Sequence, residues 1–453
     1  MAKAKSNSKK ITLEESLVPV EEQPYEVPEN WCWVKHNSIL DISGGSQPAK
    51  SHFITEPREG YTQLYQTRDY GEHPIPVYIP NKYATKTTCE GDILLARYGG
   101  SLGKVFRAHD GAYNVALTKV IKIYPELIDD EFLYKYYLSQ FYQNFCIKAS
   151  NGRSAQAGFN RDDMNSLPFP LPPLAEQKRI VDQIESLFSK LDEANEKAQE
   201  VIDRIETNIE AILYNAFSGK LTQYWRKENG VDYNWEKSTL SKIVSGLKYG
   251  SSEKSDYNNN GTPVLRIPNI GEGVIDFSDL KYMQGEFENS SHEVFENDIL
   301  IIRSNGSRDL VGKCAIVPAL ERRFAYASFL IRIKASDKVL PNYLVRYINS
   351  SMARGQLFAK AKSSSGIHNI NSKELGSIRI DVPTIEEQTE ILKIIEPLIK
   401  KELAVKNITS HMIENIAELK KSILTKAFRG ELGTNVSLEK SSIELLKKTM
   451  EEG

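Results

Sequence analysis

The glycine-rich stretch at residues 99–104 is the first part of the sequence whose residue types and spacing could bind a phosphate. It is one residue shorter than the loop that holds nucleoside triphosphates, and Val105 stands where a Ser or Thr hydroxyl would bind magnesium. The corresponding stretch, residues 306–313, is one residue too long and is followed by Cys314. We therefore predict that both stretches are turns that present backbone groups and a cation, not nucleotide sites.

Carboxylates and metal-binding residue types offer one further candidate centre. Asp256, Asp279 and Lys281 crudely match the carboxylate and lysine set of a nuclease, although such spacing arises by chance in most chains of this length. The seven His form no HxxxH pair, and the four Cys lie far apart without a CxxC pair. We expect no catalytic centre, no metal site and no cofactor bound by this chain, and a free-standing nuclease remains an alternative.

Polar and cationic residues gather in loops at corresponding places in the two halves of the chain. Arg, Asn and Gln can form bidentate hydrogen bonds with guanine or adenine edges, whereas Lys, Ser and backbone amides suit phosphates. Any one of these residues could belong to an ordinary solvated surface, but their recurrence in both halves favours contacts with DNA. The candidates in the first half are Gln66, Arg68, Arg97, Tyr98, Ser101, Lys104, Asn151, Arg153 and Gln156. The candidates in the second half are Lys248, Tyr249, Arg266, Asn269, Arg303, Asn305, Arg308, Lys313, Lys360, Lys362, His368 and Asn371.

These loops belong to a unit that the chain contains twice. Residues 172–221 align with residues 383–432 at a constant offset of 211 and without gaps. Weaker correspondences precede each copy. They pair residues 90–97 with 296–303, residues 33–44 with 235–246, and residues 103–104 with 312–313. The repeat predicts two diverged copies of one domain, each followed by a long helix.

The helical segments carry apolar residues at coiled-coil spacing. Residues 174–217 contain no Gly or Pro, and Ile184, Leu191, Ala198, Ile205 and Ile212 lie seven apart, which calls for a partner helix. The second copy should supply it through Ile391, Ile395, Leu398, Val405, Met412, Ile416, Leu419 and Ile423. Glu402 and Thr409 also fall at its seam positions, and Pro397 should kink or restart this helix. We predict an antiparallel coiled coil with pseudo-twofold symmetry; the alternative is two helices that each pack on their own domain.

The remaining segments predict a mixed α/β (α+β) fold with short strands. Buried strands are expected at residues 92–97 and 298–303, and helices at residues 132–145 and 341–358. The predicted parts are a mobile arm (1–30), a domain (31–171), a long helix (172–217), a linker (218–232), a second domain (233–382), a second long helix (383–428) and a tail (429–453) with a short helix.

The charge is distributed unevenly although the formal net charge is only -2. Residues 31–171 carry +1 and residues 233–382 carry +4, whereas residues 172–232 carry -4. Because non-specific DNA affinity scales with the phosphates neutralised, we expect weak binding by the chain alone. The sequence has neither a secretory signal nor a run approaching about 18 apolar residues, so we expect a cytoplasmic protein without membrane contact.

The duplicated architecture resembles the specificity subunit of type I restriction-modification enzymes. The likeness covers about residues 28–432 and rests on two pairs of segments. Each domain ends in a proline-containing segment with a Glu-Gln pair, residues 171–177 and 382–388, which opens a long helix. Each helix closes on Ala-Phe-x-Gly-x-Leu, at residues 216–221 and 427–432. Thr384 in place of the second proline and Pro397 are mild departures from the pattern.

The resemblance implies that each domain is a target recognition domain that reads one half of a split site in double-stranded DNA. It implies that the paired helices set the length of the spacer between the half-sites. Two methyltransferase (modification) subunits would dock around the helices, and motor-nuclease (restriction) subunits would join them. S-adenosylmethionine, ATP and magnesium would bind to those partners, and this chain would be non-catalytic. A coiled-coil adaptor that never touches DNA remains a further alternative.

Overall fold

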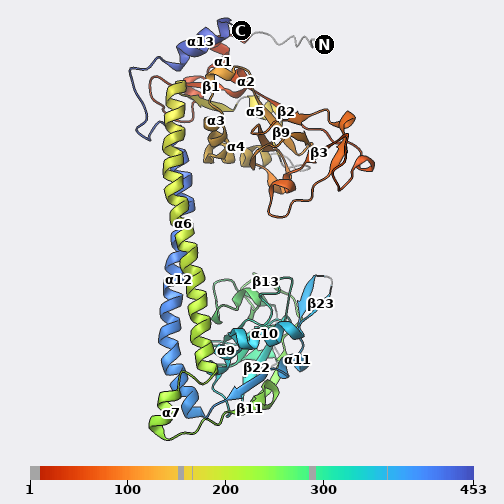
Figure 1. Cartoon of the computed structure of the whole chain (residues 1–453), viewed down its shortest axis with the longest axis vertical. Helices are drawn as coiled ribbons and strands as arrows, with labels where there is room; N and C mark the ends of the chain where they lie inside the picture. The colour runs from red at the N-terminus through yellow and green to blue at the C-terminus, as the bar shows by residue number, and fades with distance from the viewer. Residues whose placement is uncertain (1–10, 152–157, 166, 285–291, 365, 453) are drawn as a thin grey trace. The chain divides into compact units, whose positions relative to one another are not determined.

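The computed structural model describes residues 11–151, 158–165, 167–284, 292–364 and 366–452. The chain divides into two compact units, of which the first comprises residues 1–197 with 412–453 and the second comprises residues 198–411. Each unit contains a domain of short strands and helices, together with part of two long helices, α6 (Leu174–Phe217) and α12 (Ile385–Phe428) (Figure 1). The predicted mixed α/β class, with two tandem domains and two long helices, is confirmed.

Within its described residues, the first domain contains two four-stranded sheets. All neighbours in one sheet are antiparallel, and its central strand β6 is buried at every residue. In the other sheet, β3 and β8 are parallel. The first sheet has the order β2 (Leu40–Gly44), β9 (Leu117–Lys122), β6 (Ile93–Ala96), β7 (Val105–Arg107). The second has the order β4 (Tyr78–Pro80), β3 (Tyr61–Tyr65), β8 (Gly111–Tyr113), β5 (Thr87–Thr88), and β1 (Cys32–Lys35) pairs separately with β10 (Pro168–Leu171).

The second domain repeats this topology and extends it. Its first sheet has the order β12 (Val244–Tyr249), β22 (Leu330–Ala335), β18 (Ile299–Ile302), β20 (Cys314–Ile316), β15 (Gly273–Val274). Its second has the order β13 (Ser255–Asp256), β16 (Lys281–Met283), β14 (Thr262–Leu265), β21 (Phe324–Tyr326), β17 (Glu293–Val294). A small third sheet has the order β19 (Ser304–Asn305), β24 (Ile367–Asn369), β23 (Lys362–Ser364), and β11 (Glu236–Thr239) pairs with β25 (Arg379–Val382). The parallel pair β14 and β21 matches β3 and β8.

Each helix predicted inside a domain is in fact two helices. The first domain has α3 (Asp130–Leu138) and α4 (Gln140–Asn151), and the second has α9 (Pro341–Asn349) and α10 (Ser351–Lys360). The residue between the helices of each pair, Ser139 or Ser350, has an extended backbone. The Ser350 hydroxyl donates to the Tyr347 carbonyl at 2.6 Å, so it satisfies a carbonyl at the end of the first helix. The predictions of single helices at residues 132–145 and 341–358 are therefore wrong.

The two long helices pair antiparallel in each unit, as predicted. In the second unit, Lys406 bonds to Glu206 at 3.1 Å, and Asn208 donates to Glu402 at 3.4 Å. In the first unit, Lys420 pairs with Asp192 and lies 5.1 Å from the Phe188 ring centre. Partial burial by itself lowers the pKa of Lys406, but hydrogen bonds to Glu272 and Glu206 outweigh it and raise that pKa.

The predicted seam of α12 is correct for some of its residues and wrong for others. Ile391, Ile395, Thr409 and Ile416 are buried as predicted, whereas Leu398, Val405, Met412 and Leu419 are exposed, at 43%, 40%, 46% and 51%. The buried face also carries Ile399, and Lys406 and Lys420 on this side of the helix pair with α6. Long lysine stems cover apolar surface while their ammonium groups bond to acids of α6, so polar residues occupy positions that hydrophobicity alone assigns to solvent. Pro397 lies within α12, which continues through it, so the helix does not restart there, and the kink stays a prediction.

The core of each domain includes the start of one long helix and the end of the other. Ile180 and Ile184 of α6 belong to the first core, together with Phe428 at the end of α12. Ile391 and Ile395 of α12 belong to the second core, together with Phe217 at the end of α6. Apolar burial thus anchors both helices in each unit, and the alternative in which each helix packs only on its own domain is wrong.

A buried glutamine fixes the start of each long helix to its domain. The Gln177 amide donates to the carbonyls of Leu127 and Pro172, both at 2.9 Å, and its oxygen accepts from the Asp129 N–H at 2.9 Å. Gln388 makes the same three contacts with Lys338, Pro383 and Leu340 at 2.8–3.0 Å. Neither glutamine has any exposed surface.

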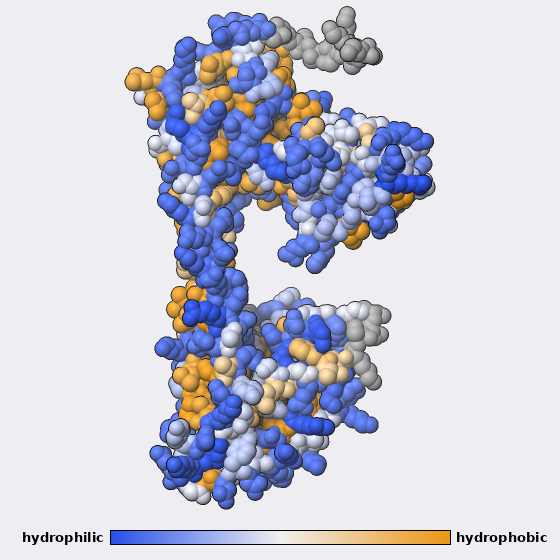
Figure 2. All heavy atoms as spheres, in the orientation of Figure 1, coloured by the Kyte–Doolittle hydropathy of each residue, from blue (hydrophilic) through white to orange (hydrophobic). Residues whose placement is uncertain are grey.

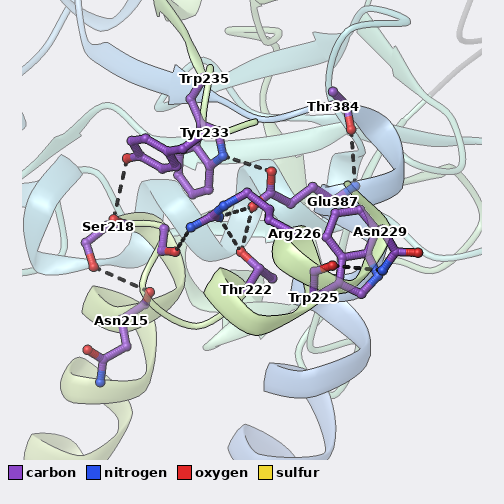
Figure 3. A network of polar contacts seen from close by, with 11 residues as sticks. Asn215, Ser218, Thr222, Trp225, Arg226, Asn229, Tyr233, Trp235, Thr384 and Glu387 are labelled. Carbon is purple, nitrogen blue, oxygen red and sulfur yellow. Dashed lines mark hydrogen bonds and ion pairs between the residues drawn. The ribbon is translucent and has the colours of Figure 1, made fainter. Parts of the chain in front are cut away.

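The glutamate that precedes each glutamine joins the helix to the segment before the first strand. In the second unit, Glu387 accepts hydrogen bonds from the Thr222 hydroxyl (2.6 Å) and the Trp235 indole (3.0 Å) and pairs with Arg226 (Figure 3). Arg226 belongs to α7 (Gln223–Asn229), a helix inside the predicted linker, and its side chain is 9% exposed. The linker is therefore a packed part of the second unit.

Neutral donors replace the arginine in the first unit. Glu176 accepts from the Trp31 indole and the Asn435 amide, both at 2.8 Å. Burial raises the pKa of Glu176, and the hydrogen bonds from Trp31 and Asn435 oppose that rise. Because Trp31 and Trp235 play the same part, the alignment of residues 33–44 with 235–246 is wrong by two residues at its start. Strand pairing agrees, since Cys32 faces Leu171 as Glu236 faces Val382.

Residues 11–30 are packed, which corrects the prediction of a mobile arm for that part. They include α1 (Leu13–Ser16), which Thr12 caps. The Val18 N–H donates to the Trp33 carbonyl at 3.0 Å. The predicted tail helix is α13 (Ser442–Glu452), whose Ser442 N–H donates to the Asn30 carbonyl at 3.0 Å. Residues 1–10 lie outside the described residues.

Replacing Arg226 with Met should destabilise the second unit by about 3 kcal/mol, because Glu387 would keep a buried charge without its cation. Urea denaturation of the purified chain measures the change. Lys227→Met on the exposed face of the same helix is the control and should change the unfolding free energy by less than about 0.5 kcal/mol. Equal midpoints for the two variants would contradict the assigned role of the pair.

Acidification should destabilise the first unit through His36. Complete burial lowers the pKa of His36 to about 3, and its Nε2 lies 2.7 Å from the Tyr137 hydroxyl. The unfolded chain takes up the proton below a pKa of roughly 6.5, so this contribution is present above that pH and is lost as pH falls. Between pH 6.5 and pH 5 it should cost about 2 kcal/mol. His36→Gln should lack this slope in denaturation curves, and an identical slope in both proteins would rule His36 out as its origin.

Candidate nucleic-acid interface

Arg97 and Arg303 lie at the same place in the two domains, directly after the central strands β6 and β18. The Arg97 N–H donates to the Ala116 carbonyl at 3.0 Å, and the Arg303 N–H donates to the Phe329 carbonyl at 3.0 Å. Each arginine carbonyl in turn accepts from a residue after the paired domain helices, Phe159 at 3.1 Å or Ile370 at 2.8 Å. The repeat therefore positions both side chains with the same backbone bonds.

Both guanidinium groups retain hydrogen-bond donors. The Nε of Arg97 and the Nε of Arg303 are buried without a hydrogen-bond partner among the described residues. Among the described residues, the terminal nitrogens of Arg303 make only long bonds, to the Ser328 carbonyl at 3.4 Å and the Asn369 side chain at 3.3 Å. Both arginine side chains are partly exposed, so their terminal nitrogens, unlike the buried Nε, are suited to receive an acceptor from a ligand.

Gln66 and Arg266 form a second equivalent pair, at the ends of the parallel strands β3 and β14. Each precedes a short 3-10 helix, η3 (Thr67–Tyr70) or η7 (Ile267–Asn269). The Nε2 of Gln66 and the Nε of Arg266 are also buried without a partner among the described residues. Arg266 additionally bonds to Asp279 at 3.0 Å, which restrains its guanidinium. Four predicted candidates thus carry unused donors at two equivalent places.

Asn269 holds a loop together and presents no surface to DNA in this conformation. It is 0% exposed, its amide donates to the carbonyls of Asp276 and Asp279 at 2.9 Å, and its oxygen accepts from the Arg266 N–H at 2.8 Å. The equivalent residue, Asp69, accepts from the Gln66 N–H at 2.8 Å. Burial raises the pKa of Asp69, and that hydrogen bond opposes the rise.

The small third sheet gathers several candidates of the second domain beside Arg303. Asn305 of β19 pairs with His368 of β24, and Lys362 belongs to the neighbouring strand β23. Asn371 caps α11 (Ser372–Gly376), and its side chain accepts from the Glu374 N–H at 2.8 Å. In the first domain, Tyr98 makes the corresponding bridge to Gly158. Arg153 and Gln156 lie outside the described residues, and Asn151 is exposed at the end of α4.

The remaining candidates differ in their exposure and in the residues next to them. Arg68, Lys104, Lys248 and Arg308 are exposed, while Ser101 and Lys360 are partly buried. Arg308 lies 5.0 Å from the Phe358 ring centre. Lys313 lines a cavity of about 280 Å³ together with residues of α6 and α12. Both glycine-rich stretches are turns, as predicted, because Gly103 and Gly312 have positive φ and donate to Ala96 and Ile302 at 3.1 and 2.8 Å.

Sequence reasoning missed two exposed aromatic residues of the second domain. Phe329, whose carbonyl holds Arg303, is 57% exposed, and Tyr257 is 67% exposed beside Lys281. Isolated aromatic residues produce no periodic pattern in a sequence. They can be recognised only in the structure, where an exposed aromatic residue lies next to a cationic one. Hydrophilic residues dominate the face of the two domains seen in Figure 2.

Each residue of the nuclease alternative has another side-chain partner. Asp279 pairs with Arg266, Asp256 accepts from Gln284 at 2.9 Å, and Lys281 lies 4.8 Å from the Tyr257 ring centre. Among the described residues, His, Cys, Asp and Glu side chains form no group suited to a metal ion. The same part of the chain contains no helix with both the length and the apolar character needed to cross a bilayer.

The fold and its duplicated sites define a protein family. The family model for the "Type I restriction modification DNA specificity domain" matches residues 28–204 and again residues 233–415. The two matches cover well over half of the sequence, so the chain belongs to this family.

Relatives and a solved structure agree with that assignment. The type I restriction enzyme EcoKI specificity subunit of Escherichia coli (strain K12) is 28% identical, over 93% of this chain and 95% of the relative. The StySPI specificity subunit of Salmonella potsdam is 24% identical, over 90% of each chain. A chain from work on the "Structural basis underlying complex assembly and conformational transition of the type I R-M system" shares the fold, with a TM-score of 0.65 and 21% identity over 90% of this chain and 100% of that chain.

Asn269→Asp should lower the unfolding free energy by at least about 2 kcal/mol at pH 7, because a carboxylate would face the two carbonyls that now accept from the amide. The fold would raise the pKa of the new carboxyl, so the loss should shrink as the pH falls toward its unfolded value of about 3.9. Denaturation at pH 4.5 and pH 7 measures this. The mirror variant Asp69→Asn keeps the acceptor for Gln66 and should cost less than about 1 kcal/mol; equal losses in the two variants would contradict the assignment.

Proposed function

We propose that this chain is the specificity subunit of a type I restriction-modification complex and reads a bipartite site in double-stranded DNA, one half with each domain. The observation that carries the proposal is the duplicated scaffold with its equivalent arginines. The same backbone bonds hold Arg97 and Arg303, while the loops around them differ. A constant framework with divergent loops suits the recognition of two unlike half-sites.

The exposed candidates are assigned to the DNA surface. Arg68, Lys104, Lys248 and Arg308 are free to approach phosphates, which position a protein without specifying sequence. Gln66, Arg97, Arg266 and Arg303 carry the unused donors and are assigned to base edges. Tyr98, Ser101, Asn305, Lys360, Lys362 and His368 belong to the short elements and turns that follow the central strands and the domain helices.

The long helices are assigned to partner docking and to the spacing of the half-sites. The outward face of α12 carries Leu398, Val405 and Ile408 in the second unit, and Ile408 is 72% exposed. In the first unit, Met412 and Leu419 continue the same seven-residue spacing. Exposed apolar residues at regular spacing on a helix suit protein contacts, so this face supports docking of two methyltransferase subunits.

The chemistry is assigned to those partners. Methyltransferase subunits would supply S-adenosylmethionine, and motor-nuclease subunits would supply ATP and magnesium, in a cytoplasmic complex. The nuclease alternative finds little support because Asp279, its central carboxylate, is paired with Arg266. The adaptor alternative does not explain why both domains contain buried hydrogen-bond donors without a partner among the described residues.

Deleting the gene for this chain in its host should erase one bipartite adenine-methylation motif, because the methyltransferase would lose its sequence reader. Long-read methylation mapping of the two strains measures this. Returning the wild-type gene should restore both half-sites, and exchanging residues 31–171 for those of a relative should change one half-site only.

An unchanged methylation map after deletion would favour the adaptor and overturn the proposal. Cleavage of DNA by the purified chain with magnesium, abolished by Asp279→Ala, would instead support the nuclease. Simultaneous change of both half-sites in the domain exchange would contradict the assignment of one half-site to each domain.

A further inference from the structure

The equivalent arginines have different supports, which becomes visible once the strands are matched through two tyrosines. The Tyr113 hydroxyl donates to the carbonyl of the residue before Gly44 at 3.0 Å. The Tyr326 hydroxyl lies within bonding distance of the carbonyls of the residue before Tyr249 (3.2 Å) and of Tyr249 itself (3.1 Å). Strand register decides the match, since Gly44 faces the second residue of β9 and Tyr249 faces the second residue of β22. Gly44 and Tyr249 therefore occupy the same place in the two domains, and a register shift early in β12 hides this in the sequence.

In the second domain, an anchored aromatic ring fixes the arginine. The Tyr249 hydroxyl donates to the Ser372 hydroxyl at 3.2 Å and accepts from the Ser372 N–H at 2.9 Å, so the ring is held at its far end. The Arg303 guanidinium lies 4.6 Å from the centre of this ring. A stacked guanidinium keeps its edge donors in one plane, which favours bidentate contacts.

In the first domain, the arginine itself occupies the corresponding space. A Cβ at Gly44 would lie 3.3 Å from the Nη1 of Arg97, so Arg97 rests against backbone where Arg303 has a ring. The ring of the adjacent Tyr98 lies 5.6 Å from the Arg97 guanidinium. Ala116 likewise stands where the second domain has the exposed Phe329. Arg97 therefore lacks the anchored ring that supports Arg303.

Guanine is the base whose edge matches these donors. It presents two adjacent acceptors, O6 and N7, in the major groove, and an arginine can bond to both. Each arginine is partly exposed and directly follows a buried strand, so its side chain does not lie on a long exposed loop. Such fixed placement suits a base edge better than a phosphate, which exposed lysines can reach without orientation.

We propose that Arg97 and Arg303 each recognise a guanine at equivalent positions of the two half-sites, and that Tyr249 is a positioning residue for Arg303 alone. The proposal rests on the proposed function. It deepens that function by naming the base and the residues that recognise it. It also states that the two half-sites differ in how strictly they require guanine.

Methylation mapping in the host, with variant genes replacing the native one, tests the proposal. Arg303→Gln should move the preference at one position of one half-site from guanine toward adenine, because Gln suits the adenine edge. Arg97→Gln should do the same in the other half-site. Discrimination at each altered position should change about ten-fold or more. A shift of preference is a gain that misfolding does not produce.

Tyr249 variants separate positioning from general stability. Tyr249→Ala should weaken the guanine preference at the position assigned to Arg303 and leave the other half-site intact. Tyr249→Phe keeps the ring and should retain the motif, and Gly44→Ala should affect only the half-site of Arg97.

The outcomes distinguish this proposal from the proposed function. A bipartite motif that persists unchanged in Arg303→Gln and Arg97→Gln would overturn the base assignment while leaving the specificity role intact. Uniformly weaker methylation without a change of motif would mark the arginines as phosphate contacts and also overturn it. If both arginine variants lost methylation altogether, Tyr249→Ala and Gly44→Ala would decide, and an unchanged guanine preference in both half-sites would overturn the proposal. A motif that survives deletion of the whole gene would instead defeat the proposed function.

Discussion

The architecture depends on a glutamine at the start of each long helix, whose amide nitrogen and amide oxygen are both hydrogen-bonded. Gln177 and Gln388 have no contact with solvent, and each satisfies two carbonyls and one N–H of its own domain. Helix direction relative to the domain is therefore set by directional bonds and not by apolar packing alone, which tolerates rotation. The neighbouring glutamate adds a second tie, to Trp31 or to Trp235.

This constraint leaves the far side of each domain free to vary. The strand that ends in Arg97 or Arg303 is buried and carries the same backbone bonds in both copies, whereas its neighbours change from Gly44 to Tyr249. Substitutions at such strand ends cost little stability where few buried groups depend on them. The fold thus separates the part that must be kept from the part that can adopt a new target.

Features that depend on local pattern were predictable from the sequence, and those that depend on tertiary contacts were not. The gap-free helical repeat, the buried strands and both strand-end arginines follow from periodicity and offset. The α12 seam follows only in part: Ile391, Ile395 and Ile416 are buried as their spacing indicates, but Lys406 and Lys420 use their stems as apolar surface at positions that the pattern assigns to solvent. The tryptophan match failed since a residue type recurred two positions away from its structural equivalent, and the breaks at Ser139 and Ser350 require knowledge of what the hydroxyl bonds to. Among the site candidates, only burial reveals that Asn269 supports its loop.

The order of translation affects the folding of the two units differently. The second unit is continuous, from residue 198 to residue 411, and can complete its core as soon as that stretch has emerged. The first unit waits for Phe428, which enters its core, and for Asn435, which bonds to Glu176. A domain translated first is therefore finished last, and the nascent chain carries its incomplete core until translation is nearly over. The amino-terminal domain should therefore depend more on chaperones than the second domain. It should also be the domain that premature termination of translation leaves unfolded.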